Sequence, residues 1–291
     1  MILCQTDIST LTAARLSQLR ADLWLLSPAC QPYTKLNPNA RGASDPRAQS
    51  FLHLIDNVLP QLAVQQVHPR YLLVENVTGF QDSETRYHLV STLKRLGYQI
   101  AEFNLTPLQF GIPNSRLRYY LLAKLSHLKF LGCDDSRLNI LDHIPSQHPV
   151  ISVAARCLNH YLDELDNESM ASFKVSDRVL EKWGRLFDIL VERAGSILQM
   201  NEQLNTTRVF DGFLAAQRNG DAQAVQLLGC LRLRYFTPDE LLRLFHITGS
   251  YRLIGNSVNC GDLGQVIRRL INYLFIEEGH DASSAIMPEA T

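Results

Sequence analysis

The fold is decided by the stretch Leu23-Trp24-Leu25-Leu26-Ser27-Pro28-Ala29-Cys30-Gln31-Pro32-Tyr33. Its first four residues are an apolar run, short enough for a buried strand. Pro28 and Pro32 follow closely, and the strand must stop there because each proline fixes φ and removes a backbone donor. The stretch therefore predicts a stiff loop at the carboxyl end of a strand, with the thiol of Cys30 between two prolines. In open α/β sheets, ligands bind at that end of the strands.

Three later segments also combine polar side chains with an apolar run. Each places acidic, basic or amide groups where a strand or helix begins or ends. The segments are Tyr71–Val77, with Glu75 and Asn76; 111–120, with Arg116 and Arg118; and 252–259, with Asn256 and Ser257.

Taken in this order, the four segments closely resemble the cytosine-5 methyltransferases, and the resemblance runs from about residue 4 to residue 276. Residues 31–34, 111–124 and 231–238 are most similar to the members of that family that methylate tRNA. The resemblance implies an α/β fold, namely the Rossmann-like sheet of S-adenosylmethionine-dependent methyltransferases, with a smaller target-recognition domain. It implies tRNA, in particular the anticodon loop of tRNA-Asp, as substrate, with DNA as the alternative.

The chemistry of the family gives these residues their expected roles. C5 of cytosine is a poor nucleophile, and addition of a thiolate to C6 makes C5 able to attack a methylsulfonium. Cys30 is expected to be that covalent nucleophile, and Glu75 to bond the base at N3 and its amine and supply a proton. Arg116 and Arg118 are expected to position both groups and favour the thiolate. The target base must leave its stack to reach them.

The resemblance also implies which residues bind the cofactor and the substrate. Asn76 is expected to orient the cysteine loop, in addition to its contact with nucleic acid. S-adenosylmethionine is assigned to Asp7, Ile8, Ser27, Pro28, Asn256 and Ser257, and nucleic acid to Gln31, Tyr33, Asn76, Arg232 and Arg234.

Composition limits the class of protein. The chain has 291 residues with 28 basic and 29 acidic side chains, so any basic surface for nucleic acid must be local. Six cysteines without a Cys-x-x-Cys pair argue against a zinc site or a disulfide framework. No apolar run is long enough for a membrane helix, and no secretory signal is recognisable. We expect no metal and a location in the cytoplasm and nucleus.

Plainer interpretations stand beside these roles. Most cysteines are inert small hydrophobes, and Arg116 and Arg118 could be salt-bridge partners. Residues 233–240 favour a capped helix start, with Thr237 as the cap and Pro238 at the first helical position. A cysteine hydrolase would need a base near Cys30, but no hydrolase motif surrounds the available histidines.

The chain also departs from the family pattern. No glycine-rich Phe-x-Gly-x-Gly turn precedes Asp7, Ala29 replaces a proline, and the Cys-Phe-Thr segment of the tRNA-type members is absent. We therefore expect a sheet that lacks the family's central first strand at its N-terminus, with a gap where that strand would lie. A non-catalytic member that only binds RNA is the alternative to an active enzyme.

The expected domains are an incomplete catalytic domain at 1–140, a target-recognition domain at 141–244, a return to the catalytic domain at 245–278 and a disordered tail at 279–291. Strand, helix and strand alternate in the first part, as in an α/β sheet. Further strands are expected at 98–105 and 117–124, and helices at 10–20, from Asp45, from Ser83 to Gly97, at 174–204, at 214–232 and from 263 to 275.

Overall fold

The computed structural model describes residues 6–34, 41–112, 116–131, 139–145, 158–182, 206–231, 233–244 and 262–275. The chain divides into two compact units, Met1–Ala155 with Asp262–Thr291, and Arg156–Gly261. None of the helices in the described ranges is long and apolar enough to cross a membrane. The same ranges hold no group of three or more His, Cys, Asp or Glu side chains placed to hold a metal ion.

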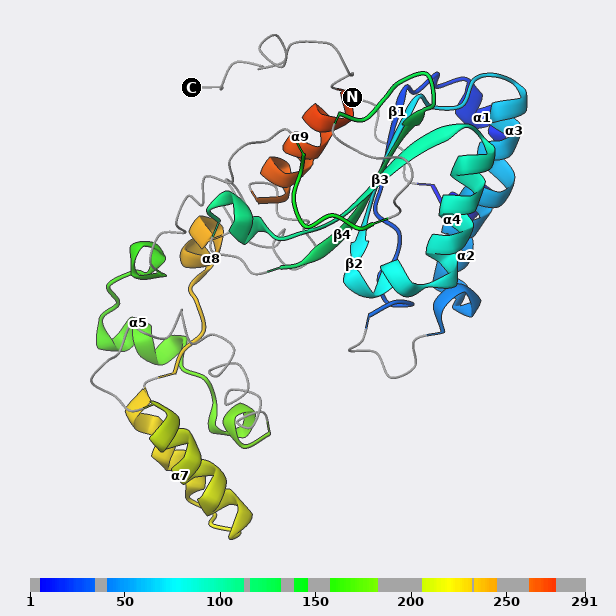
Figure 1. The fold of residues 1–291 in the computed structure, drawn as a ribbon. Helices are drawn as coiled ribbons and strands as arrows, with labels where there is room; N and C mark the ends of the chain where they lie inside the picture. The colour runs from blue at the N-terminus through cyan, green and yellow to red at the C-terminus, as the bar shows by residue number, and fades with distance from the viewer. Residues whose placement is uncertain are drawn as a thin grey trace. The chain divides into compact units, whose positions relative to one another are not determined.

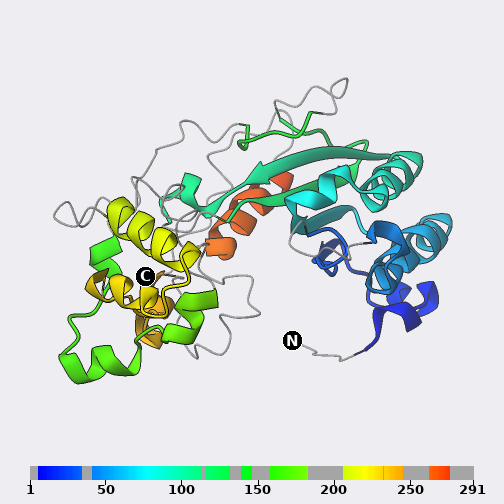
Figure 2. The same ribbon diagram turned by 90° about the horizontal axis from the view of Figure 1, so that it is seen from below.

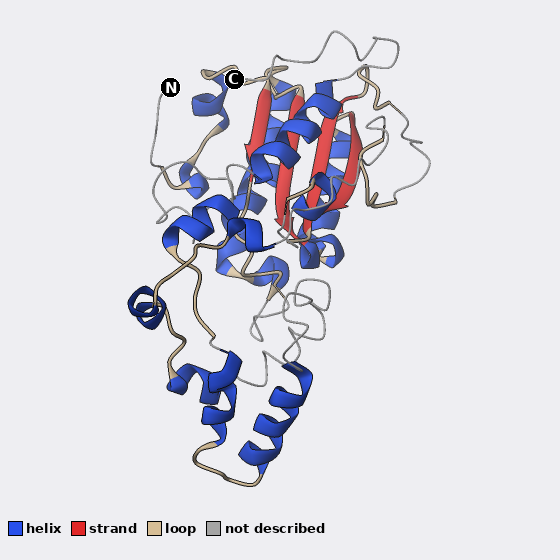
Figure 3. Cartoon of the chain, turned by 90° about the vertical axis from the view of Figure 1, so that its left-hand side faces the viewer, coloured by secondary structure: helices blue, strands red, loops and turns tan. Residues whose placement is uncertain are grey.

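A mixed sheet forms the centre of the first unit (Figure 3). Its strands are β1 (Leu23–Leu26), β2 (Tyr71–Val77), β3 (Tyr98–Leu105) and β4 (Arg118–Leu125), in the order β1-β2-β4-β3. β1 runs parallel to β2, and the other two pairs are antiparallel. All four strands were predicted; β2 runs three residues further than its apolar part, and β4 begins one residue later than expected.

No gap separates the four described strands, and the gap expected from the missing first strand stays a prediction. β1 pairs directly with β2, from Leu23 opposite Tyr71 to Leu26 opposite Val74, so the described strands are contiguous. β1 lies instead at the edge of this sheet, where Leu25 is 54% exposed. The pairing of β1 with β2 uses only one side of β1, so it does not depend on a strand at the other side.

The two faces of the sheet follow from the alternation of side chains along each strand. One face packs on α2 (Pro46–His53), α3 (Leu59–Val64) and α4 (Glu84–Arg95), with a π-helical turn (Leu54–Val58) between α2 and α3. Figure 1 shows these helices together on one side of the strands. The core that they share with the sheet includes Phe51, Ile55, Leu59, Leu72, Val74, Phe80, Leu89, Leu93, Tyr119 and Leu121.

The other face is covered by α9 (Asp262–Phe275), which lies beside the strands in Figure 2. The Phe103 and Tyr273 rings meet edge to face with centroids 5.9 Å apart. Lys124 is fully buried between sheet and helix, where its ammonium donates to the Leu274 carbonyl at 3.4 Å and lies 4.5 Å from the Phe130 ring centroid. The predicted C-terminal helix is confirmed.

Two predicted helix starts are confirmed by their caps. The Asp45 carboxylate accepts from the Arg47 backbone N–H, and the Ser83 hydroxyl accepts from the Arg86 N–H. α4 ends where Gly97 adopts a left-handed φ of 79°. The helix expected at 10–20 is shorter, α1 (Ala13–Ser17). Short 3₁₀ turns lie at Ile8–Thr10, Gly42–Ser44, Thr78–Asp82, Pro107–Phe110, Leu158–Tyr161 and Ala224–Leu231.

The described part of the second unit contains α5 (Asn167–Ser172), α7 (Thr206–Arg218) and α8 (Pro238–Leu244). The helix expected at 214–232 is wrong in its bounds, because Gly220, with φ of 74°, ends α7 and a separate 3₁₀ turn follows. Residues 177–182 are helical, and most of the helix expected at 174–204 lies outside the described residues. Phe213, Val225 and Leu228 form the centre of this unit's core.

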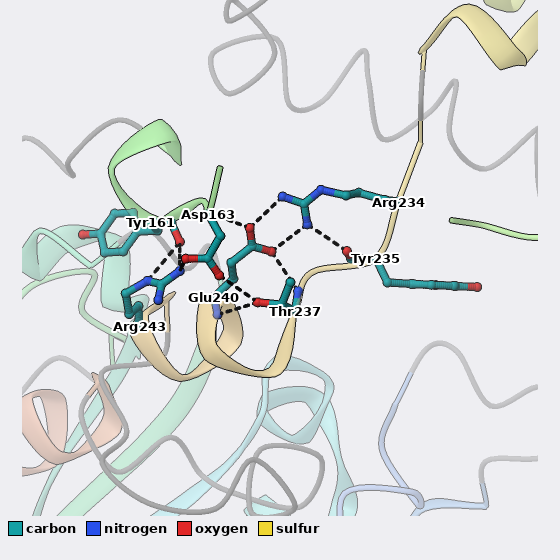
Figure 4. Close-up of polar contacts among 7 residues, drawn as sticks. All are labelled: Tyr161, Asp163, Arg234, Tyr235, Thr237, Glu240 and Arg243. Atoms are coloured by element: carbon teal, nitrogen blue, oxygen red, sulfur yellow. Dashed lines mark hydrogen bonds and ion pairs between the residues drawn. The ribbon is translucent and has the colours of Figure 1, made fainter. Parts of the chain in front are cut away.

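A buried polar network organises the N-terminus of α8 (Figure 4). Thr237 and Glu240 form a capping box, in which each side chain accepts from the other residue's backbone N–H at 3.1 and 2.8 Å. Glu240 is fully buried and receives two hydrogen bonds from Arg234, at 2.6 and 2.7 Å. The Asp163 backbone N–H donates to the Glu240 carboxylate, and the Asp163 carboxylate accepts from Arg243. The predicted cap is therefore confirmed.

We predict that this network makes the second unit sensitive to acid. Burial alone would raise the pKa of Glu240, but the hydrogen bonds from Arg234 and from the Asp163 and Thr237 N–H groups lower it to about 2. A carboxyl whose pKa is lowered in the folded state stabilises the fold above its ordinary pKa of 4.5, and this contribution is lost as pH falls toward 2. Glu240→Gln should flatten the fall in melting temperature over that pH range, measured by circular dichroism.

The matched control is Asp239→Asn, which removes an exposed carboxylate from the same turn of α8. This variant should keep the wild-type dependence on pH. Equal acid sensitivity of Glu240→Gln and the wild type would show that the charge on Glu240 does not stabilise the unit.

Candidate active site

The loop after β1 closes on itself. The Cys30 carbonyl accepts from the backbone N–H groups of Tyr33 and Thr34, at 2.9 and 3.1 Å. This turn leaves Cys30 exposed and its thiol free of any disulfide. The stiff thiol-bearing loop predicted from the two prolines is therefore present at the carboxyl end of β1.

Glu75 lies beside this loop because of the strand pairing. Leu26 is opposite Val74 in the parallel β1–β2 pair, so the next residues, Ser27 and Glu75, are neighbours. The Ser27 hydroxyl donates to Glu75 Oε2 at 2.6 Å. The Glu75 residue is 8% exposed, and Arg118 Nε lies 3.5 Å from its Oε1. Three segments far apart in sequence thus meet at one carboxylate.

Asn76 points to the opposite face of β2 and holds the loop from there. Its amide donates to the Pro28 carbonyl at 3.2 Å, and its side-chain oxygen accepts from the Val77 N–H at 2.8 Å. The residue is 1% exposed. This geometry agrees with the loop-orienting role; the predicted contact with nucleic acid is not supported, because both polar atoms of the side chain bond to backbone.

Two arginines are electrostatically coupled to Cys30. Burial lowers the pKa of Arg118 and the like charge of Arg116 adds to this, while the charges of Glu75 and Cys30 oppose it. Hydrogen bonds to Asp45 raise the pKa of Arg47, and the Cys30 charge contributes in the same direction. Both arginines therefore place positive charge near the Cys30 side chain.

Tyr120 is a further polar group on the Glu75 face of the sheet. It lies directly opposite Glu75 in the β2–β4 pair and is fully buried. Burial raises its pKa, and the negative charge of Glu75 adds to the effect. In the described part of the chain its hydroxyl has no hydrogen-bond partner. A buried donor without a partner, facing a carboxylate, is unusual in a native core and makes this region a candidate binding site.

The remaining predicted residues divide into three groups. Gln31 and Arg116 are exposed beside the loop, where they can meet a substrate. The contact of Tyr33 with nucleic acid stays a prediction, and the observed contacts give it a structural role. Its ring packs edge to face on Phe80, its hydroxyl donates to Thr85 at 3.0 Å and the residue is 6% exposed. Arg232, Asn256 and Ser257 lie outside the described residues.

Arg234 makes its observed hydrogen bonds within the second unit. Its guanidinium donates to both oxygens of Glu240 and to the Tyr235 carbonyl at 3.0 Å, and the side chain is 17% exposed. Its contact with nucleic acid stays a prediction, and the observed contacts give it a structural role.

Sequence reasoning missed three features of this site. Arg47 and Tyr120 carried no signal, since their approach to Cys30 and Glu75 depends on tertiary structure. The bond from Ser27 to Glu75 had a signal: each residue immediately follows an apolar four-residue strand core. Two strands paired in parallel at those cores bring their next residues together.

The strand ends of this mixed α/β sheet bring together a free thiol, a buried carboxylate and an arginine, which are groups able to carry out nucleophilic and acid–base chemistry. The family described as C-5 cytosine-specific DNA methylase matches residues 3–272, and the chain belongs to this family. Its methyltransferases use S-adenosylmethionine.

Individual relatives refine this assignment. A Schizosaccharomyces pombe protein named tRNA (cytosine(38)-C(5))-methyltransferase is 35% identical over 92% of this chain and 82% of its own length. A Dictyostelium discoideum protein named DNA (cytosine-5)-methyltransferase is 31% identical over the same shares. The crystal structure of a Spodoptera frugiperda DNMT2 mutant matches with a TM-score of 0.64 and 28% identity, covering 94% of this chain and 85% of the other. The fold is that of the S-adenosylmethionine-dependent methyltransferases, as predicted.

Proposed function

We propose that this chain transfers a methyl group from S-adenosylmethionine to C5 of a cytosine in tRNA, through a covalent adduct of Cys30 with C6. The carrying observation is the convergence of the Cys30 loop, Glu75 and Arg118 through strand pairing. The similarity to proteins named as tRNA methyltransferases supports tRNA as the substrate. Within tRNA we propose the anticodon loop of tRNA-Asp as the specific site, as the family resemblance of the sequence implies. DNA is the alternative substrate, since one relative carries that name. We expect the protein in the cytoplasm and nucleus.

Each described residue has a definite task in this reaction. Cys30 adds through sulfur to C6, which places electron density on C5, and Arg47 and Arg118 stabilise the thiolate before addition. Glu75 holds the base at N3 and its amine and donates the proton that neutralises the ring as sulfur adds. Bound S-adenosylmethionine supplies the electrophilic methyl group. Solvent water then takes the C5 proton, the thiolate departs from C6 and the ring proton returns to Glu75, which restores the aromatic base and the enzyme.

Two of the residues assigned to S-adenosylmethionine, Asp7 and Ile8, are described by the structure, and their side chains are of a kind that can bind its adenine. Ile8 is 43% exposed at the first position of a 3₁₀ turn, and the Asp7 carboxylate caps that turn by accepting from the Ser9 N–H at 2.9 Å. An exposed apolar side chain next to a carboxylate oxygen suits the face and the amino group of adenine.

Calorimetry with S-adenosylmethionine, followed by transfer of tritiated methyl groups to tRNA and to DNA, tests this proposal on the full chain. Micromolar binding and incorporation into tRNA are the expected results. A folded chain that binds no S-adenosylmethionine would exclude the enzyme and leave a non-catalytic member of the family.

We predict that Ser27 positions Glu75 for the reaction. Ser27→Ala removes the 2.6 Å hydrogen bond and should lower kcat about tenfold, the value of one hydrogen bond to a charged group. Affinity for S-adenosylmethionine should stay unchanged, and Ser27→Thr, which keeps a hydroxyl, should retain most activity. Weaker cofactor binding with unchanged kcat would instead support the prediction that Ser27 contacts the cofactor.

A further inference from the structure

The segment 233–240 has two residues that its local structure does not explain. Arg234, Thr237 and Glu240 are used by the network at the start of α8. Between them lie Tyr235 and Phe236, which are 52% and 40% exposed. Two consecutive exposed aromatic side chains are costly in water unless something covers them.

The backbone of this pair is held in place from three sides. The Tyr235 N–H donates to the Phe173 carbonyl at 2.8 Å, and the Tyr235 carbonyl accepts from Arg234 at 3.0 Å. The Thr237 N–H is held by the buried Glu240. Figure 4 shows the Tyr235 ring pointing away from the network that fixes its backbone. A preorganised aromatic ring loses little conformational entropy when it binds a ligand.

Positive charge lies next to the pair. Lys174 is opposite Arg234 in an isolated antiparallel bridge, so its backbone lies one residue from that of Tyr235. Its side chain is 66% exposed, and its ion pair with Asp177 is long, at 3.9 Å. Aromatic side chains next to a cation are the elements that proteins use to bind unpaired nucleotides, by stacking on the base and attracting the phosphate.

We propose that Tyr235 and Phe236 form a stacking platform for an unpaired base of the nucleic-acid substrate, with Lys174 attracting its backbone. This inference rests on the proposed action on nucleic acid, and it identifies the residues of the second unit that would bind the substrate. The platform would select unpaired nucleotides over duplex, because a paired base has no free face to offer. An apolar segment of another protein is the competing occupant.

Fluorescence anisotropy of the full chain with labelled RNA tests the platform. The probes are a hairpin with an unpaired loop and a blunt duplex of the same length. Tyr235→Ala should weaken binding of the hairpin about tenfold, because stacking of one base contributes on that order. Duplex binding should not change, and Tyr235→Phe, which keeps the ring, should bind the hairpin as the wild type does.

Tyr87→Ala is the matched control, since Tyr87 is 59% exposed on α4 in the other unit. It should leave hairpin binding unchanged. Three results would overturn the platform. Tyr235→Ala could bind the hairpin as tightly as the wild type does, it could lose as much affinity for the duplex as for the hairpin, or the wild type could bind no RNA. A change in oligomeric state with Tyr235→Ala would also overturn it, because that change would indicate a protein partner.

Methyl transfer separates this inference from the proposed function. If the chain binds the hairpin through Tyr235 but transfers no methyl group, the stacking platform is supported and the proposed enzyme activity is contradicted. If the chain methylates tRNA and Tyr235→Ala binds the hairpin as the wild type does, the proposed enzyme activity is supported and the stacking platform is contradicted.

Discussion

Cys30→Ala should abolish methyl transfer, with a loss of more than about 10⁴-fold in kcat, because removal of a covalent nucleophile leaves no route to the adduct. The Cys30 side chain is exposed, so its truncation leaves no cavity. The turn is closed by hydrogen bonds to the Cys30 backbone carbonyl, which the substitution does not change. S-adenosylmethionine affinity and melting temperature should therefore match the wild type. The rate is measured with tritiated S-adenosylmethionine and tRNA.

A trapped adduct gives a second readout of the same prediction. Wild-type protein should form a covalent complex with RNA that carries 5-fluorocytosine at the target, because fluorine at C5 cannot leave as a proton does. Cys30→Ala should form none. Cys4→Ala, which removes a thiol outside the Cys30 loop, is the control and should retain the complex. Full activity of Cys30→Ala would contradict the covalent mechanism.

Arg86→Met should destabilise the first unit by about 3 kcal/mol or more, the cost of leaving a buried charge without its partner. Arg86 donates two hydrogen bonds to Glu102, at 2.6 and 2.8 Å, and the exposed fractions of the two side chains are 12% and 3%. The Tyr119 hydroxyl also donates to Glu102 and cannot replace the lost positive charge. Urea unfolding followed by tryptophan fluorescence measures the change, since Trp24 packs on this core.

Two further variants identify the cause. The double variant Arg86→Met with Glu102→Gln should recover much of the lost stability, because it removes the buried negative charge while keeping an acceptor for Tyr119. Arg70→Met breaks an ion pair with Asp22 whose side chains are 52% and 65% exposed, and should cost less than about 1 kcal/mol. Equal costs for Arg86→Met and Arg70→Met would show that burial of the Glu102 charge does not matter.

Local patterns in the sequence determined the elements of this protein. The four strands, the caps at Asp45 and Ser83 and the C-terminal helix could all be predicted, because apolar alternation and capping depend on residues a few positions apart. The segments that bear Cys30, Glu75 and Arg118 could be named for the same reason, together with a resemblance that the family match confirmed.

Only the tertiary structure decided how those segments meet. β4 lies between β2 and β3, and this order brings Arg118 and Tyr120 to Glu75. The inward packing of Tyr33 and the pairing of Arg234 with Glu240 overrode their local appearance as surface residues. Strand order and burial depend on contacts between residues distant in sequence, so no pattern within one segment contains them. The sequence thus determined which groups are available for the chemistry, and the pairing of strands decided which of them share a site.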